Sequence, residues 1–197
     1  GHCLLAGIAS PERAARLAEQ LLQPSMYGGW GIRTVAETER RYNPMSYHNG
    51  SVWPHDNALI ALGLSRYGFN EHAARLLSDL LQASLHFDRR RLPELFCGFS
   101  RTPESGPTLY PVACSPQAWA SGSLFLLIQA CLGLTLNAPA GEVRIMHPVL
   151  PEAIQDLWIE RLSLGGSTLD LHVHRVPGDV NVVITRREGE VEVVVVR

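Results

Sequence analysis

The sequence predicts a mainly α-helical protein with a smaller β region at its C-terminal end. Apolar residues recur at helical spacing in several segments before residue 137, whereas after residue 138 they recur at every second position. A short turn at Gly68 joins two of the predicted helices, which makes them antiparallel neighbours. The chain has 197 residues, enough for one domain with a real hydrophobic core, with or without a small appendage.

The predicted helices are marked by residues that favour helix starts and ends. Ser10 and Pro11 begin the first, and Pro24 ends it. The second spans 52–67, with Ser51 as its expected N-cap. The third spans 70–87, with Asn70 as its expected N-cap.

A fourth helix is predicted from Ser115-Pro116 to Gly133 or Leu134. Its apolar run, Trp119–Leu136, approaches the length of a membrane span. The run contains Ser and Gly residues and has no basic residues close to its ends, so a helix buried on all sides is favoured.

After residue 138 the alternation of apolar and polar residues predicts short strands, separated by turns such as Gly165-Gly166 and Pro177–Asp179. We expect a small antiparallel sheet packed on the helical part.

Composition excludes several classes of function. The net charge of −2 argues against a nucleic-acid or anionic-membrane partner. All 17 basic residues are Arg, which excludes a Walker-type phosphate loop and a Schiff-base lysine. The four cysteines lack C-x-x-C spacing, so we expect buried thiols in a reducing, cytoplasmic compartment and no metal or other cofactor.

Two long loops are the predicted functional parts of the chain, because loops of this length are uncommon in compact domains. They span residues 23–51 and about 86–114. The first leads into the helix 52–67 and the second leaves the helix 70–87. Since these helices are antiparallel, both loops attach at the same end, and we expect them to meet in space.

The stretch Tyr42–Asp56 combines two Tyr, one Trp, two His and one Asp with Asn and Pro. Flat rings beside amide, imidazole and carboxylate groups suit a sugar, which has an apolar face and a rim of hydroxyls. A well-packed loop of aromatic spacers explains the same composition. Both interpretations stand on this stretch alone.

Glu94 is the candidate catalytic carboxylate. It lies in the second loop among apolar neighbours, which make the pKa of a carboxyl tunable. Glycoside hydrolysis needs two such groups, one to protonate the leaving oxygen and one to activate water or attack. A structural ion pair with one of the arginines 89–91 is the alternative.

The other candidate residues are weighed in the same way. The rings of Trp30, Tyr47 and Trp53 either stack on a sugar or pack within the protein. Arg33 either bonds sugar hydroxyls or forms an ordinary loop ion pair, and His48 either donates to a sugar or shapes the loop. Asp56 is favoured as an acid in the first turn of a helix. His172 and His174 share one strand face, but no third metal ligand is suggested. The candidate substrate-binding residues are Trp30, Arg33, Tyr47, His48, Trp53 and Asp56.

Six runs of this sequence resemble the bacterial and archaeal glycogen debranching enzymes (amylo-α-1,6-glucosidases), a family of six-hairpin glycosidases. The run Tyr42–Asn57 is the most specific of them. The six runs are Gly1–Leu4, Gly29–Thr34, Tyr42–Asn57, Leu92–Phe96, Gly98–Arg101 and Tyr110–Trp119.

This resemblance implies that residues 1–137 are the C-terminal portion of an (α/α)6 barrel, a partial toroid of helical hairpins, and that 138–197 form a β-rich tail packed on it. It implies inverting hydrolysis of α-glucosidic bonds in glycogen or a related oligosaccharide, with Glu94 as general base. The family's general acid is expected upstream of Gly1, so the missing N-terminal part of the barrel is an expected partner. The alternative is a non-catalytic remnant, or a sugar-binding or structural fragment. Another chemistry on the same toroid, such as a phosphorylase or epimerase, is a weaker third hypothesis.

Overall fold

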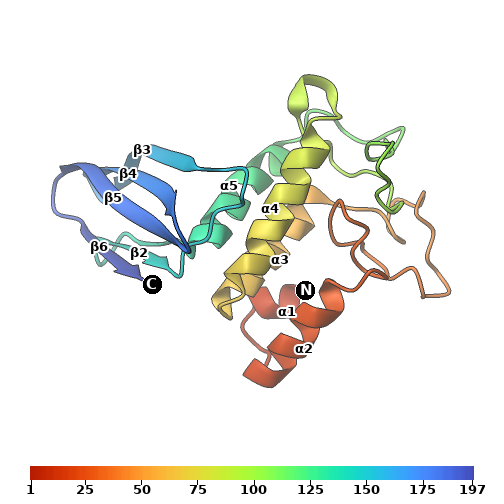
Figure 1. Cartoon of the computed structure of the whole chain (residues 1–197), viewed down its shortest axis with the longest axis horizontal. Coiled ribbons are helices and arrows are strands. Elements are labelled where there is room, and N and C mark those ends of the chain that lie inside the picture. The colour runs from red at the N-terminus through yellow and green to blue at the C-terminus, as the bar shows by residue number, and fades with distance from the viewer.

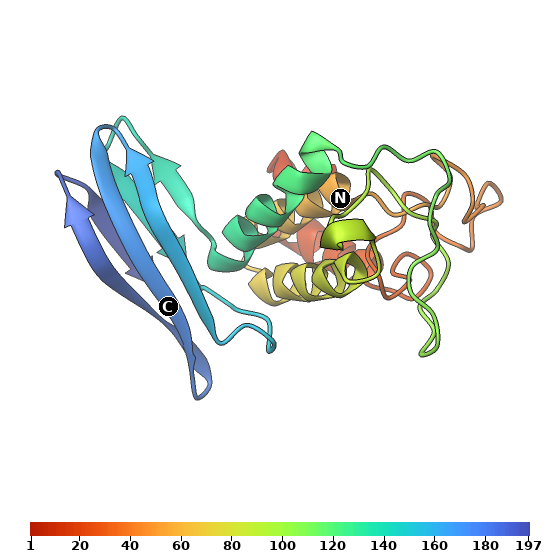
Figure 2. The same ribbon diagram turned by 90° about the horizontal axis from the view of Figure 1, so that it is seen from above.

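The computed structural model describes residues 1–197 and contains a helical part followed by a β part (Figure 1). The long loops lie at one end of α4 and α5 and the strands lie at the other (Figure 2). The helices are α1 (His2–Leu5), α2 (Pro11–Leu21), α3 (Pro54–Arg66), α4 (Asn70–Ser84) and α5 (Ala118–Leu132), with a 3-10 turn at Asp88–Arg90. The strands are β1 (Thr135–Asn137), β2 (Glu142–Met146), β3 (Asp156–Leu164), β4 (Ser167–Val176), β5 (Asp179–Glu188) and β6 (Glu192–Val196).

The expected fold class, a mainly α partial (α/α)6 toroid, is wrong. Helices take up 31% of the residues, and strands together with isolated bridge residues take up 25%, so the fold is mixed α/β. The C-terminal residues form six strands, and long loops occupy much of the region in which helical hairpins were expected. The division at residues 137 and 138 stays a prediction, although β1 lies before it.

All four predicted helices are present, but the expected capping is only partly correct. Ser10 accepts a hydrogen bond from the Arg13 backbone N–H, as a helix N-cap does. Ser51 does not cap α3, because its hydroxyl donates to the Tyr47 carbonyl instead. Asn70 is the first residue of α4, and its side chain reaches the β part rather than the helix.

Helix α5 differs from the expectation of a helix buried on all sides. One face, including Ala120, Leu127 and Cys131, packs against α3 and α4 in the larger hydrophobic core. The opposite face leaves Phe125 78% exposed and Trp119 51% exposed. Uniform apolarity along the sequence therefore did not mean uniform burial. No helix in the structure combines the length and apolar character that crossing a membrane requires.

The β part contains two three-stranded sheets rather than one. β3, β4 and β5 form the antiparallel meander that the sequence predicts. The second sheet has the order β1-β2-β6, in which β2 and β6 are parallel, so the expectation of a wholly antiparallel sheet is wrong. Alternation predicts a strand but not its partner, and these two strands are far apart in the chain.

Side chains from both sheets meet in one smaller core cluster, which contains Val143, Ile145, Leu169, Leu171 and Val173. Leu132, at the end of α5, belongs to the same cluster. The β part is thus docked on the C-terminal end of α5, away from the long loops (Figure 2).

Candidate active site where the two loops meet

The prediction that the two long loops meet in space is confirmed. Val52 and Phe96 exchange backbone hydrogen bonds of 2.9 and 3.0 Å. Arg33 pairs with Val52 on one side, and Leu109 pairs with Phe96 on the other. This short ladder fixes four loop segments at the end of the helical hairpin.

Glu94 lies beside this ladder and is only 7% exposed. Its Oε1 accepts a hydrogen bond of 2.7 Å from the Tyr47 hydroxyl, and its Oε2 accepts one of 3.1 Å from the Cys114 backbone N–H. The Glu94 backbone N–H in turn donates to the Cys114 carbonyl at 3.0 Å. The side chain pairs with none of the arginines 89–91, so the ion-pair alternative does not apply in this structure.

The two hydrogen bonds favour the ionised form of Glu94. The Tyr47 hydroxyl, followed by the Cys114 backbone N–H, holds the pKa of Glu94 below its ordinary value of 4.5. The same hydrogen bond raises the pKa of Tyr47 to about 12. Near neutral pH the pair is therefore a phenol donating to a carboxylate.

Aromatic rings surround this pair. Tyr47 contacts His48, Trp53 and Tyr110 edge to face, with ring centroids 4.7, 4.8 and 5.6 Å apart. His48 is exposed, whereas Trp53 is buried and donates its indole N–H to the Ser51 hydroxyl at 2.9 Å. The rings predicted from Tyr42–Asp56 thus gather around Glu94, with Trp53 as an inner layer and His48 at the surface.

Arg33 was predicted to bond sugar hydroxyls. It is 2% exposed, and its guanidinium donates to the carbonyls of Gly98 at 2.7 Å and Pro24 at 2.8 Å. It also donates to the Ser100 hydroxyl at 2.8 Å. These bonds tie the two loops together. The substrate contact stays a prediction, and the geometry gives Arg33 a framework role.

Trp30 and Asp56 make their polar and ring contacts with residues other than Glu94. Trp30 is buried, with the Arg101 guanidinium 4.2 Å from its ring centroid and His86 at its edge. Asp56 lies in the first turn of α3, as favoured from the sequence, and its Oδ1 is 3.2 Å from Nε2 of His2. Asp56 also lines a cavity of about 290 Å³ together with Trp53 and Arg33.

Sequence reasoning missed three site residues: Tyr110, Cys114 and Trp119. Cys114 is exposed rather than buried as expected, and its backbone N–H holds Glu94. Trp119 stacks on His55, which belongs to the stretch Tyr42–Asp56, with ring centroids 4.1 Å apart, and His55 contacts Trp53 edge to face at 5.7 Å. The run Tyr110–Trp119 carried the only signal, because it belongs to the segments that resemble the glycosidases.

No group of three or more His, Cys, Asp or Glu side chains is arranged to hold a metal ion. His172 and His174 share a face of β4 as predicted, and His172 bonds the Asp156 carboxylate at 2.7 Å. No ion pair or hydrogen bond brings a second carboxylate to Glu94. The site therefore offers one ionised carboxylate in an aromatic surround, which is what a general base needs.

Comparison with known proteins shows that this region is similar to a glycoside hydrolase domain. Residues 2–99, which include Tyr42–Asp56 and Glu94, match a family described as the mannosylglycerate hydrolase MGH1-like glycoside hydrolase domain. Two relatives from Selaginella moellendorffii, mannosylglycerate hydrolases MGH1 and MGH2, are each 33% identical over 76 residues. That overlap is 39% of this chain and 16% of each relative, so the chain matches a small part of their length. The comparisons support a glycoside hydrolase and do not support the glycogen debranching type.

Proposed function

We propose, on the basis of the glycoside hydrolase domain matched by residues 2–99, that Glu94 is the general base of an inverting glycoside hydrolase. The observation that carries the proposal is the environment of the Glu94 carboxylate. It is buried beside aromatic rings, and two donors favour its ionised form. An ionised carboxylate can take a proton from water, whereas a protonated one cannot.

In this mechanism, Glu94 removes a proton from a water molecule, which attacks the anomeric carbon on the face opposite the leaving group. The C–O bond to the leaving group breaks as the new C–O bond forms, so the configuration is inverted. Inverting enzymes keep their two carboxyls about 6.5–9.5 Å apart to leave room for this water. Tyr47 keeps its proton and orients the carboxylate.

A second carboxyl must protonate the leaving oxygen, and we infer that it comes from a segment outside these 197 residues. This inference rests on the resemblance to the glycogen debranching enzymes, whose general acid is expected in a more N-terminal segment. The segment that supplies the acid is therefore the proposed partner of this chain. Tyr47, His48 and Trp53 are proposed to contact the sugar, because their rings surround the Glu94 carboxylate.

Two substrates are candidates. The motif resemblance favours α-glucosidic bonds of glycogen or a related oligosaccharide. The names of the two relatives favour mannosylglycerate, in which the sugar is linked to a small carboxylic acid. The second class of function is a non-catalytic or sugar-binding remnant, which has the same aromatic cluster but no turnover.

The substitution Glu94→Gln tests the catalytic role in the enzyme that also carries the acid segment. We expect kcat to fall by about 10²–10⁴-fold, the usual contribution of a general base, with KM nearly unchanged. Release of glucose from a branched α-glucan and of mannose from mannosylglycerate would be followed, with the anomer formed read by NMR. Glu39→Gln is the control, since Glu39 is an exposed acid of the first loop. Turnover that is unaffected by Glu94→Gln removes Glu94 from the mechanism.

The 197-residue chain by itself is expected to hydrolyse neither substrate at a useful rate, because it holds only the base half of the site. Robust sugar release by the purified chain would contradict the inference that the general acid comes from a segment outside these 197 residues. If the enzyme with the acid segment is equally inactive, the non-catalytic hypothesis holds.

A further inference from the structure

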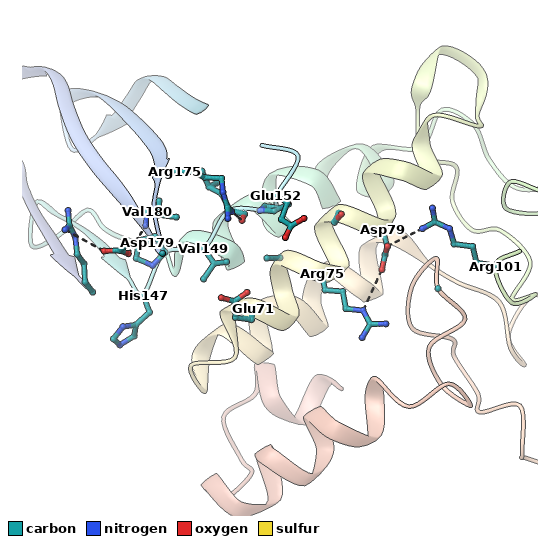
Figure 3. Close-up of a pocket in the computed structure, with 18 residues that line it drawn as sticks. Glu71, Arg75, Asp79, Arg101, His147, Val149, Glu152, Arg175, Asp179 and Val180 are labelled. Carbon is teal, nitrogen blue, oxygen red and sulfur yellow. Dashed lines mark hydrogen bonds and ion pairs between the residues drawn. The ribbon is translucent and has the colours of Figure 1, made fainter. Parts of the chain in front are cut away.

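A larger cavity lies away from Glu94, between α4 and the β part (Figure 3). Its volume is about 790 Å³, within the range of pockets that hold small ligands. Glu71, Arg75 and Asp79 of α4 lie on one side, and Glu152, Arg175 and Asp179 lie on the other (Figure 3). None of the residues that hold or surround Glu94 lines it. We call this cavity the α4–β cleft.

The charges of the α4–β cleft largely neutralise one another. Arg101 and Arg75 approach the Asp79 carboxylate at 3.4 and 3.9 Å, and Arg197 approaches Asp179 at 3.8 Å. Four arginines and four acids line the cleft, so it has no excess positive charge to attract a polyanion. It also offers no three-ligand cluster for a metal ion.

Several polar groups in the cleft keep unused hydrogen-bonding capacity. The carboxylates of Glu71 and Glu152 make no hydrogen bond or ion pair within the chain, and both lie toward the space between α4 and the strands (Figure 3). Arg175 uses one guanidinium nitrogen on the Leu150 carbonyl and keeps its other nitrogens free. Val149 and Val180 also line the cleft and add apolar surface to it.

We propose that the α4–β cleft is a second, non-catalytic binding site for a neutral oligosaccharide. Sugar hydroxyls both donate and accept, so they satisfy carboxylates and a guanidinium at once without bringing charge into a balanced cleft. The apolar lining of Val149 and Val180 suits the C–H face of a sugar ring. The choice of an oligosaccharide rests on the proposed function, whereas the demand for a neutral ligand with many hydroxyls follows from the cleft.

The test is an NMR titration of the ¹⁵N-labelled 197-residue chain with maltohexaose, and in a second arm with a linear mannohexaose. We expect shifts of the Val149, Arg175 and Val180 amide signals, and at least a tenfold loss of affinity at these signals in the double variant Glu71→Gln/Glu152→Gln. Glu19→Gln is the matched control, because Glu19 is an exposed acid of α2 with no partner. Ser78→Phe, which places a ring in the cleft from α4, gives a second test that removes no carboxylate.

The outcomes separate this proposal from the catalytic one. Shifts confined to signals around Tyr47 and Glu94 with either sugar overturn the cleft site. It is also overturned if the double variant and Ser78→Phe both bind the sugar as tightly as the parent chain does. Glu94→Gln is expected to leave the cleft signals unchanged. Cleft binding in a chain whose complete enzyme shows no turnover would reject the catalytic proposal while keeping the second site.

Discussion

At the scale of single residues, the candidate site centres on the hydrogen-bonded pair Tyr47 and Glu94, to which we assign its proposed chemistry. The sequence placed the two residues in separate loops and predicted both as site residues. Their hydrogen bond of 2.7 Å joins segments that are 47 residues apart in the chain. The bond lowers the pKa of Glu94 and raises that of Tyr47, so it defines which of the two carries the proton.

The substitution Tyr47→Phe is expected to raise the pKa of Glu94, since the largest cause of its depression is removed. The acidic limb of the pH–rate profile of the complete enzyme should therefore move to higher pH. The stability that Glu94 contributes is present above its ordinary pKa of 4.5 and is lost as pH falls through the lower folded value. In Tyr47→Phe the folded pKa lies closer to 4.5, so this contribution should be smaller and its loss should be complete at a higher pH in acid unfolding. An acidic limb at the same pH as in the parent enzyme would contradict this role.

At the scale of elements, the site depends on how closely two loop backbones approach. A Cβ on Gly98 would lie 1.7 Å from the Gly50 carbonyl oxygen. The Gly98 carbonyl also accepts from the Arg33 guanidinium, at 2.7 Å, and from the Tyr42 hydroxyl, at 3.0 Å. A side chain at position 98 would therefore push apart the two loops that Arg33 holds together.

The substitution Gly98→Ala is expected to destabilise the protein by at least about 1–3 kcal/mol, as overpacking does, and to disturb the position of Glu94. Gly122→Ala is the matched control, because nothing lies within 4 Å of a Cβ at that position in α5. Alanine favours a helix over glycine by about 0.5–1 kcal/mol, so this control should be stabilising. Urea unfolding of both variants measures these changes in stability. Equal unfolding midpoints for Gly98→Ala and Gly122→Ala would contradict the close approach of the two loop backbones at Gly98.

At the scale of the whole molecule, polar contacts join the two hydrophobic cores, in addition to Ile128 and Ile154, which pack against both. Asn70 is 4% exposed, and its amide N–H₂ donates to the carbonyls of Met146 at 2.8 Å and His147 at 2.6 Å. The Val149 backbone N–H donates to the Cys131 carbonyl at 2.8 Å. These bonds fix the strands against the ends of α4 and α5 and thereby shape the α4–β cleft.

The substitution Asn70→Ala is expected to cost about 1–3 kcal/mol, because it leaves two carbonyls without their donor. Thermal or urea unfolding measures this cost, with Asn49→Ala as the control, since Asn49 is exposed and its side chain makes no bond. Loosened docking should also weaken sugar binding in the cleft, which the NMR titration would detect. A stability equal to that of the parent chain would show that the two parts do not depend on Asn70.

The sequence by itself determined the approximate positions of four helices, α2 to α5, most strand positions and the meeting of the two loops. The site roles that it suggests for Glu94 and Tyr47 stay predictions. Local periodicity and turn residues act over a few positions, so they can be read from the sequence. The short turn at Gly68 makes the two helices antiparallel, which brings both loops to the same end of the hairpin. Only the tertiary structure decided the balance of α and β, the exposure of α5 and the parallel pairing of β2 with β6. It also decided that Arg33 and Trp30 are buried, while Cys114 reaches Glu94. Burial and pairing depend on which distant segments pack together, and no local pattern specifies that.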